Sequence, residues 1–235
     1  MDTQSRPTLL ITRPQAQAEA FARVVDDVYP AKWAFEFAPL LEIIPLNAAV
    51  DLTDVHTLIF TSANGVRAFS AATDRRDVPA LCVGQTTAEV AEQAGIAVQF
   101  AAPDARSLLD VIISRPKPPG QAQFLHVRGV HQSVKLAEEL QKAAIPAREL
   151  VLYDQNEKPL PQHVLLRLHD GEIDTVTLFS QRTARIFVKQ SSSIKLPETL
   201  RVICLSDAVA VPFRGKQVRV EVAAKPDQSS IIALL

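Results

Sequence analysis

Side chains that can bind anions follow the ends of six short apolar runs in this sequence. They lie in segments 12–14, 61–65, 84–87, 128–129, 180–183 and 206–207, which offer hydroxyl, amide and guanidinium groups and a single carboxylate, Asp207. Helix N-termini carry unpaired N–H donors and a partial positive charge, and arginine adds a planar pair of donors, so the set predicts a site for carboxylate or phosphate groups. Any one of these hydroxyls is typical of an ordinary helix cap, so the prediction rests on the whole set.

Metal, nucleotide and covalent chemistry find less support in the sequence. His126 and His131 have no cysteine or glutamate at a metal-binding spacing, so we expect packed or surface imidazoles and no bound metal. The chain has only 7 glycines, which form neither a Walker loop nor a dinucleotide-binding GxGxxG motif. No serine lies in a nucleophile-elbow motif. We therefore expect no nucleotide cofactor and no covalent intermediate.

Tyr153 is one of two tyrosines in the chain and lies in the apolar segment ELVLYDQ, residues 149–155. We expect it at the end of a strand, near a connection between domains. Its phenol could donate a hydrogen bond to a ligand in a cleft, or the side chain could pack at a domain boundary as an amphipathic residue. The residue types alone leave both interpretations open.

Short apolar runs alternate with amphipathic stretches along the whole chain. The first pair is TLLIT followed by residues 15–25, in which Ala18, Phe21, Ala22 and Val25 fall on one helical face. The same pattern recurs at 56–72, 80–94, 123–144 and 174–190. Alternation of this kind predicts an α/β fold of parallel sheets with helices on both faces.

The two halves of the chain repeat the same order of elements. Matching positions are Arg13 with Arg128, Ser62 with Ser180, Phe69 with Phe187, Cys82 with Cys204, and residues 101–102 with 223–224. A proline-rich segment, 116–120, separates the halves. The extended segments 36–43 and 148–155 follow the first helix of each half, and we expect them to cross between two domains. The sequence therefore predicts an internal duplication.

Composition bounds the class of protein. The 235 residues are 47% hydrophobic and 22% charged, which indicates a globular chain with room for two domains. A formal net charge of −1 argues against a surface devoted to nucleic acid. We expect neither export nor membrane insertion, because no secretory signal and no apolar run of spanning length is recognisable. Two cysteines in apolar runs, Cys82 and Cys204, fit a reducing cytoplasm.

The ordered set of short segments resembles the uroporphyrinogen-III synthase family along nearly the whole chain. The segments that carry the resemblance are LLITRP, LIFTSANGVRAF, CVGQTTAEVAEQAG, FLHVRG, LVLYD, TVTLFSQRTARIF and VEVAAKPDQSSIIALL. Each segment is short and degenerate, and the match rests on their order and spacing together. The sequence departs from the family pattern at residues 206–210, SDAVA, where many relatives have a Gly-x-Thr-Ala-like turn.

The resemblance implies an α/β protein of two flavodoxin-like parallel-sheet domains, joined by a two-stranded extended linker, with a ligand cleft between them. One domain would be discontinuous and combine residues 1–37 with 163–235, and the other would be inserted at 46–150. Residues 38–45 and 151–162 would form the crossings between the domains. The duplicated units would thus exchange their opening strand and helix.

The resemblance also implies a reaction in haem biosynthesis. A uroporphyrinogen-III synthase closes hydroxymethylbilane, a linear tetrapyrrole with eight carboxylates, with loss of water and inversion of the terminal pyrrole ring through a spiro intermediate. The family uses no metal and no organic cofactor. We expect a cytoplasmic monomer with this small-molecule substrate as its ligand, a transient contact with the deaminase that supplies the substrate, and neither nucleic acid nor membrane as a partner.

Carried onto this sequence, the resemblance assigns to Tyr153 the role of assisting departure of the hydroxyl. The residues assigned to the substrate are Arg13, Thr61, Ser62, Asn64, Gly84, Thr86, Thr87, Arg128, Gly129, Ser180 and Gln181, many of them through backbone N–H groups. Because the substrate must be held in one folded shape, positioning should matter more than acid–base strength. Two alternatives stay open: a two-domain cytoplasmic anion receptor without chemistry, and tandem phosphoreceiver modules. The latter need an acidic cluster at the strand ends, where only Asp207 lies.

Overall fold

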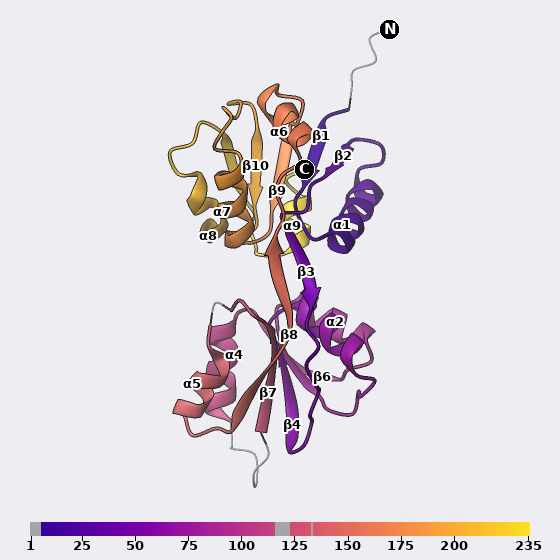
Figure 1. Ribbon diagram of the computed structural model, residues 1–235, viewed down its shortest axis with the longest axis vertical. Helices are drawn as coiled ribbons and strands as arrows, with labels where there is room; N and C mark the ends of the chain where they lie inside the picture. Colours follow the sequence, from indigo (N-terminus) through magenta and orange to yellow (C-terminus); the bar gives the residue numbers. More distant parts are fainter. Residues whose placement is uncertain (1–5, 116–122, 133) are drawn as a thin grey trace. The chain divides into compact units, whose positions relative to one another are not determined.

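The computed structural model describes residues 6–115, 123–132 and 134–235. The proline-rich segment 116–120, expected to separate the halves, lies outside these residues. The chain divides into two compact units: unit 1 contains the residues up to Glu42 together with Asn156–Leu235, and unit 2 contains Ile43–Gln155. Each unit is built around its own sheet (Figure 1).

Unit 1 contains a five-stranded sheet with the spatial order β11-β10-β9-β1-β2. Its elements are β1 (Thr8–Ile11), α1 (Gln15–Val28), β2 (Ala34–Phe37), α6 (Gln162–His169), β9 (Thr175–Leu178), α7 (Gln181–Gln190), β10 (Arg201–Cys204), α8 (Asp207–Ala210), the 3-10 helix η1 (Val211–Phe213), β11 (Arg219–Val222) and α9 (Gln228–Ile232). Each neighbouring pair in this sheet is parallel. Numbered along unit 1, the strands follow the order 2-1-3-4-5 of flavodoxin-like proteins.

Unit 2 is built on a six-stranded sheet with the order β3-β8-β7-β4-β5-β6. Its elements are β3 (Leu41–Pro45), β4 (Val55–Phe60), α2 (Ala63–Ala72), β5 (Ala80–Val83), α3 (Gln85–Gln93), β6 (Val98–Ala102), α4 (Ala105–Ser114), β7 (Gln123–Gly129), α5 (Leu136–Lys142) and β8 (Ala147–Glu157). The five strands from β8 to β6 pair in parallel. When β7 and β8 are matched with β1 and β2, both units have the same spatial order.

Helices cover both faces of each sheet, as alternation of strand and helix requires (Figure 1). In unit 2, Val66 and Phe69 of α2 pack with Phe60 of β4 on one face. Leu108 of α4 packs with Ile59 of β4 on the other face. In unit 1, α6 and α7 cover one face, and α1 and α9 cover the other. The α/β fold with parallel sheets expected from the sequence is thereby confirmed.

Strands β3 and β8 carry the chain from one unit to the other and are neighbours in the six-stranded sheet. Strand β8 begins at Ala147, before the crossing expected at 151–162, because it also pairs with β7 along that stretch. Tyr153 therefore lies inside a strand, so its expected place at a strand end is wrong. The limits expected for the domains and crossings remain a prediction.

Positions that repeat in the sequence occupy equivalent places in the two sheets. Arg13 follows β1, and Arg128 lies near the end of β7. Ser62 and Ser180 are the N-cap residues of α2 and α7, the helices that follow β4 and β9. Since β1 pairs with β9 and β7 pairs with β4, each arginine lies beside the strand that leads to a serine-capped helix.

Candidate functional site

Tyr153 and Ser62 meet at the carboxyl end of strand β4 in unit 2. Tyr153 lies in β8 and is 5% exposed, and its phenol oxygen is 2.8 Å from Ser62 Oγ. Ser62 Oγ also accepts a hydrogen bond from the Gly65 backbone N–H at 3.2 Å, which caps α2. The serine thus caps a helix and contacts the phenol at once, so the capping and functional interpretations of this hydroxyl are compatible.

Gly129 allows the Tyr153 ring to lie against the backbone of β7. A shift of register after Arg128 places Gly129 opposite Tyr153. A Cβ atom on Gly129 would lie 2.6 Å from Tyr153 Cε2, far inside van der Waals contact. Only glycine lets the ring approach the strand this closely.

The Tyr153 phenol remains protonated at neutral pH. Burial raises its pKa above the ordinary value, and the hydrogen bond with Ser62 opposes that rise only in part. The phenol can therefore donate its proton to one partner while its oxygen accepts a hydrogen bond from Ser62. The group is therefore in the form that a general acid needs, although its raised pKa makes it a weaker proton donor.

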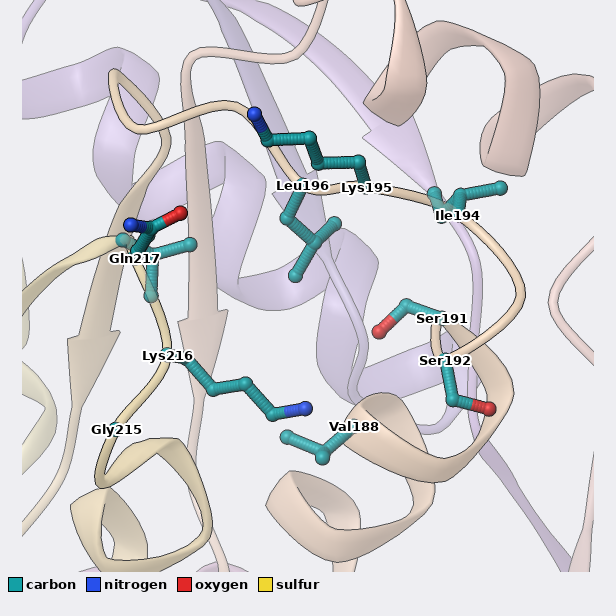
Figure 2. Close-up of a pocket in the computed structure, with 10 residues that line it drawn as sticks. Val188, Ser191, Ser192, Ile194, Lys195, Leu196, Gly215, Lys216 and Gln217 are labelled. Atoms are coloured by element: carbon teal, nitrogen blue, oxygen red, sulfur yellow. The ribbon is translucent and has the colours of Figure 1, made fainter.

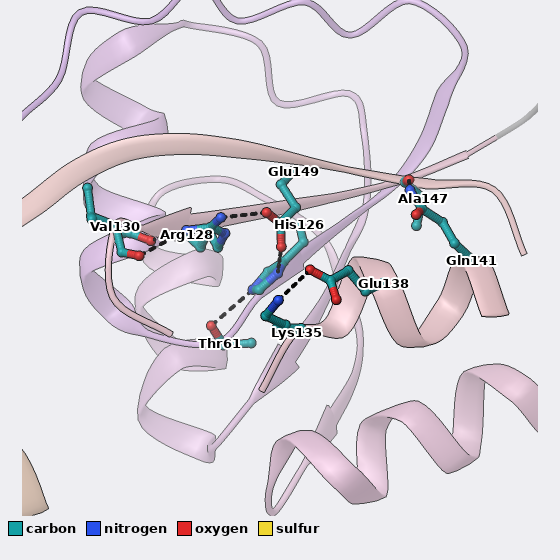
Figure 3. A network of polar contacts seen from close by, with 10 residues as sticks. Thr61, His126, Arg128, Val130, Lys135, Glu138, Gln141, Ala147 and Glu149 are labelled. Carbon is teal, nitrogen blue, oxygen red and sulfur yellow. Dashed lines mark hydrogen bonds and ion pairs between the residues drawn. The ribbon is translucent and has the colours of Figure 1, made fainter. Parts of the chain in front are cut away.

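Arg128 is held by an ion pair and by two backbone carbonyls (Figure 3). Its Nη2 lies 2.5 Å from Glu149 Oε2, and its Nη1 donates to the carbonyls of Gly129 and Val130. Although burial opposes ionisation, the Arg128 guanidinium holds the pKa of Glu149 below its usual value. The positive charge of Arg128 is therefore paired within unit 2, by a carboxylate that the sequence reasoning did not single out.

His126 lies beside this ion pair in β7 and is 1% exposed. Its Nε2 is 3.2 Å from Thr61 Oγ1, and its Nδ1 is 3.9 Å from Glu149 Oε1. Burial lowers the pKa of His126 to about 4, so the ring is neutral at pH 7. The expectation of a packed imidazole is confirmed. The neighbouring glutamate was missed because it comes from β8, which pairs with β7.

The remaining candidates of unit 2 lie in the first turns of α2 and α3. Gly84 precedes α3 with a φ of 81°, in the left-handed region that favours glycine. Thr86 is exposed and Thr87 is buried in the first turn of α3, and Asn64 is half-buried in α2. Because α2 and α3 follow the neighbouring strands β4 and β5, their N-termini lie together at the carboxyl ends of these strands.

Unit 1 has three candidate residues after the carboxyl ends of its own strands. Ser180 caps α7 through its Oγ, and Gln181 is the half-buried first residue of that helix. Arg13 donates to Gln228 Oε1 at 2.7 Å, and its guanidinium lies 4.2 Å from the centre of the Phe179 ring. The structure thus brings the candidates together in two sets, one in each unit.

Residues 206–210, where the sequence departs from the family pattern, begin a very short helix. Ser206 precedes α8 but makes no side-chain capping bond, and η1 follows α8 directly. In unit 2 the matching strand, β5, is followed by the longer helix α3. The two units therefore differ at this end of the sheet.

Other reactive groups give little indication of chemistry. Burial raises the pKa of Cys82 and of Cys204 to about 12, and both thiols are unpaired, as expected. Such thiols are poor nucleophiles. Within the described ranges, no three His, Cys, Asp or Glu side chains come together as metal ligands. No helix in the part of the chain that the structure describes is long and apolar enough to cross a membrane.

A separate cavity of about 350 Å³ lies in unit 1, beyond the C-terminal end of α7 (Figure 2). Val188 and Leu196 form part of its apolar wall, and Lys195 and Lys216 also line it. Gln217 and Val218, just before β11, also line the cavity. None of the candidate residues lines the cavity, which lies at the amino end of the strands rather than at their carboxyl end.

Comparison with known families decides the identity of the fold. The family model of uroporphyrinogen-III synthase HemD matches residues 33–233, most of the chain. The chain belongs to the uroporphyrinogen-III synthase family. The resemblance noted in the sequence is confirmed, and with it a family of lyases in tetrapyrrole biosynthesis. A search of curated proteins found no match.

Solved structures of uroporphyrinogen-III synthases share the fold. A synthetase from Helicobacter pylori is 16% identical over 98% of both chains, with a TM-score of 0.65. A mutant synthase from Thermus thermophilus is 15% identical over 97% of both chains, with a TM-score of 0.55. At these identities the likeness concerns the fold alone.

Proposed function

We propose that this chain is a uroporphyrinogen-III synthase, which closes hydroxymethylbilane with loss of water and inverts its terminal pyrrole ring. The contact between Tyr153 and Ser62, at a sheet edge rich in donors and in a chain of this family, carries the proposal. The substrate has eight carboxylates. Helix N-termini of the kind found here are suited to bind such groups.

In the proposed reaction, Tyr153 donates its proton to the terminal hydroxyl of the substrate. The bond between that oxygen and its carbon breaks, water leaves, and an azafulvene cation remains. The cation attacks the substituted carbon of the last ring to form a spiro intermediate. Fragmentation breaks the original bond to that carbon, and renewed closure at the free α-carbon of the same ring inverts it. The proton lost from this α-carbon restores the charge balance and can return to the Tyr153 phenolate. Ser62 directs its own hydrogen at the phenol oxygen, which turns the Tyr153 proton outward and stabilises the phenolate left behind.

We propose that the substrate contacts candidates from both units. In unit 2 these are Thr61, Ser62, Asn64, Gly84, Thr86, Thr87, Arg128 and Gly129, and in unit 1 they are Arg13, Ser180 and Gln181. Their place at the carboxyl ends of parallel strands supports this role. A ligand held in one folded shape cannot close to the uninverted isomer.

The activity is tested by supplying hydroxymethylbilane freshly from porphobilinogen and its deaminase, with and without the protein. After oxidation, chromatography separates the uroporphyrin isomers. We expect a change from type I to type III. Persistence of type I, with a folded protein and an active control synthase, would overturn the proposed function.

The role of Tyr153 is tested by Tyr153→Phe, which keeps the ring and removes the hydroxyl. We expect kcat to fall by roughly 100-fold, because a positioned general acid typically contributes at least this much. The only other tyrosine, Tyr29, gives a matched control, and Tyr29→Phe should retain full activity. Unchanged turnover in Tyr153→Phe would remove this residue from the mechanism.

Amide hydrogen exchange, measured with and without uroporphyrinogen III as the probe, tests whether the ligand contacts both units. We expect slower exchange in the first turns of both α2 and α7. Protection confined to one of these helices would contradict binding by both units.

We further propose that the protein acts as a monomer in the cytoplasm and receives its short-lived substrate through transient contact with the deaminase. The two unpaired, buried thiols support a reducing location. Sedimentation of the protein alone should show a monomer. Sedimentation of its mixture with the deaminase should show a weak, rapidly exchanging complex. A stable oligomer of the protein alone would contradict the first part.

A further inference from the structure

The buried imidazole of His126 has no part in the reaction as proposed (Figure 3). It lies between the Thr61 hydroxyl, 3.2 Å from Nε2, and the Glu149 carboxylate, 3.9 Å from Nδ1. Nδ1 has no hydrogen-bond partner among the described residues. A neutral imidazole carries a single N–H, so the position of that hydrogen decides what the ring does to Thr61.

The Glu149 carboxylate is fixed in place by two side chains. Arg128 of β7 holds Oε2, and the Gln132 amide, in the orientation that satisfies its hydrogen bonds, donates to Oε1 and to the Val134 carbonyl at 3.3 Å each. Burial opposes ionisation of Glu149, but Arg128 keeps its pKa below the usual value. An anion therefore faces the Nδ1 side of His126 at neutral pH.

This anion favours the form of His126 that carries its hydrogen on Nδ1. Nε2 then presents a lone pair, so the Thr61 hydroxyl has to be the donor in the 3.2 Å contact. With its hydrogen committed to His126, Thr61 offers only lone pairs in other directions. Thr61 follows β4 and is half-buried, so part of it remains accessible at the carboxyl end of the sheet.

We propose that His126 is a positioning residue that makes Thr61 a hydrogen-bond acceptor for a pyrrole N–H group of the substrate. This inference rests on the proposed function, because it names a group of the same linear tetrapyrrole. The donors at the helix N-termini suit carboxylates, but pyrrole N–H groups need an acceptor. The neighbouring Ser62 oxygen already accepts from the Gly65 N–H, which leaves Thr61 as the better placed acceptor.

Nitrogen-15 NMR of the imidazole rings at pH 7 tests the first step without any assay of activity. We expect a protonated Nδ1 and an unprotonated Nε2 in His126, assigned through the signals lost in His126→Gln. His56 is an internal reference, because its Nδ1 lies 2.8 Å from the Gln123 carbonyl oxygen, which can only accept. A hydrogen on Nε2 of His126 would overturn the inference, whether or not the protein forms uroporphyrinogen III.

Kinetics of type III formation test the second step. Thr61→Val removes the hydroxyl at constant shape and should raise KM about 3- to 10-fold with little change in kcat, as expected for loss of one uniform hydrogen bond. Thr61→Ser keeps the hydroxyl and should resemble the wild type. An unchanged KM in Thr61→Val would overturn the inference.

Variants of His126 test whether it acts through Thr61. His126→Leu should raise KM as much as Thr61→Val, and the double variant should show no further increase. His126→Gln, whose amide oxygen can accept from Thr61, should restore most of the affinity. Additive effects in the double variant would contradict action through Thr61. If His126→Leu does not fold, the Thr61→Val and Thr61→Ser variants and the NMR measurement still test the inference.

Discussion

Each unit has an arginine at the same position of its own sheet, but different side chains contact the two guanidinium groups. In unit 1, Arg13 lies over the Phe179 ring and donates to a neutral amide, Gln228. In unit 2, Arg128 forms an ion pair with Glu149 and also donates to backbone carbonyls. The repeated fold thus fixes where the guanidinium lies, and the neighbouring side chains decide what it does there.

Three neighbouring positions account for the difference. The strand registers and the serine caps show which positions of the two units correspond. The matching pairs are Ile11 with His126, Phe37 with Glu149, and Phe179 with Thr61. The three positions are apolar in unit 1 and polar in unit 2. The two sheets thus share their strand order, but only in unit 2 do these three positions carry a polar network.

Truncation in the two separate cores should produce the largest effect. Leu41 is 4% exposed in the core of unit 1, and Leu152 is 2% exposed in that of unit 2. Leu41→Ala and Leu152→Ala should each lower the free energy of unfolding by about 2–5 kcal/mol. Urea unfolding measures the loss, and hydrogen exchange locates it. The control Leu166→Ala, at a side chain 53% exposed, should cost much less. Equal destabilisation of both units by either core variant would contradict two separately packed cores.

Acid should weaken unit 2 selectively. Burial lowers the pKa of His126 from 6.5 to about 4, so below pH 6.5 the unfolded state binds a proton that the folded state does not. The free energy of unfolding should therefore fall by about 3 kcal/mol between pH 6.5 and 4. Glu149, with its lowered pKa, contributes stability whose loss begins near its ordinary value of 4.5 and continues at lower pH. The matching position in unit 1, Ile11, does not titrate.

Thermal melts and hydrogen exchange at pH 7 and pH 5 check this difference. In His126→Leu, the dependence of unit 2 on pH in this window should flatten, while that of unit 1 should be unchanged. The same slope in the variant and in the wild type would show that another group is responsible.

Gly129→Ala should have a smaller effect on stability but a direct one on the candidate site. A Cβ at this position meets the Tyr153 ring, and overpacking of this kind typically costs about 1–3 kcal/mol. Melting temperature and type III formation should fall together, because the ring has to move away from Ser62. In a Tyr153→Ala background the same glycine change should cost less stability. An equal cost in both backgrounds would mean that the contact with the ring does not limit this position.

The two serine caps should show the smallest effects. Ser62→Ala and Ser180→Ala each remove a capping hydrogen bond and should each cost about 1 kcal/mol of stability. Only Ser62 contacts Tyr153, so only Ser62→Ala should also lower kcat, by a few-fold. An equal change of kcat in the two variants would show that the contact of Ser62 with Tyr153 does not contribute to turnover.

The order of elements could be predicted because buried parallel strands and amphipathic helices leave strong local patterns. The run TLLIT and the apolar face of residues 15–25 correspond to β1 and α1. The extended segment expected at 148–155 corresponds to β8, but the pairing of its first half with β7 was not predictable in the same way. Its first half contains Arg148 and Glu149, which break the apolar run, and the strand is defined by its pairing with β7.

The candidate site was partly predictable for the same physical reason. Ser62 and Ser180 could be placed from the sequence, since a capping serine acts on a backbone group only three residues away. The contacts of His126 with Glu149 and of Gly129 with Tyr153 join different strands, and strand register sets them. No local pattern reports that register. The roles of these residues toward the substrate remain predictions.

The way the chain is divided has a consequence for its synthesis. Unit 2 is one continuous segment, so it can fold once Gln155 has left the ribosome, whereas unit 1 needs both ends of the chain. Strand β1 has to wait for its neighbour β9, which begins at Thr175. At roughly 5–20 residues per second, this delay is on the order of ten seconds. During that time the opening strands and α1 lack most of the sheet that later covers them, so their apolar faces stay exposed on the nascent chain.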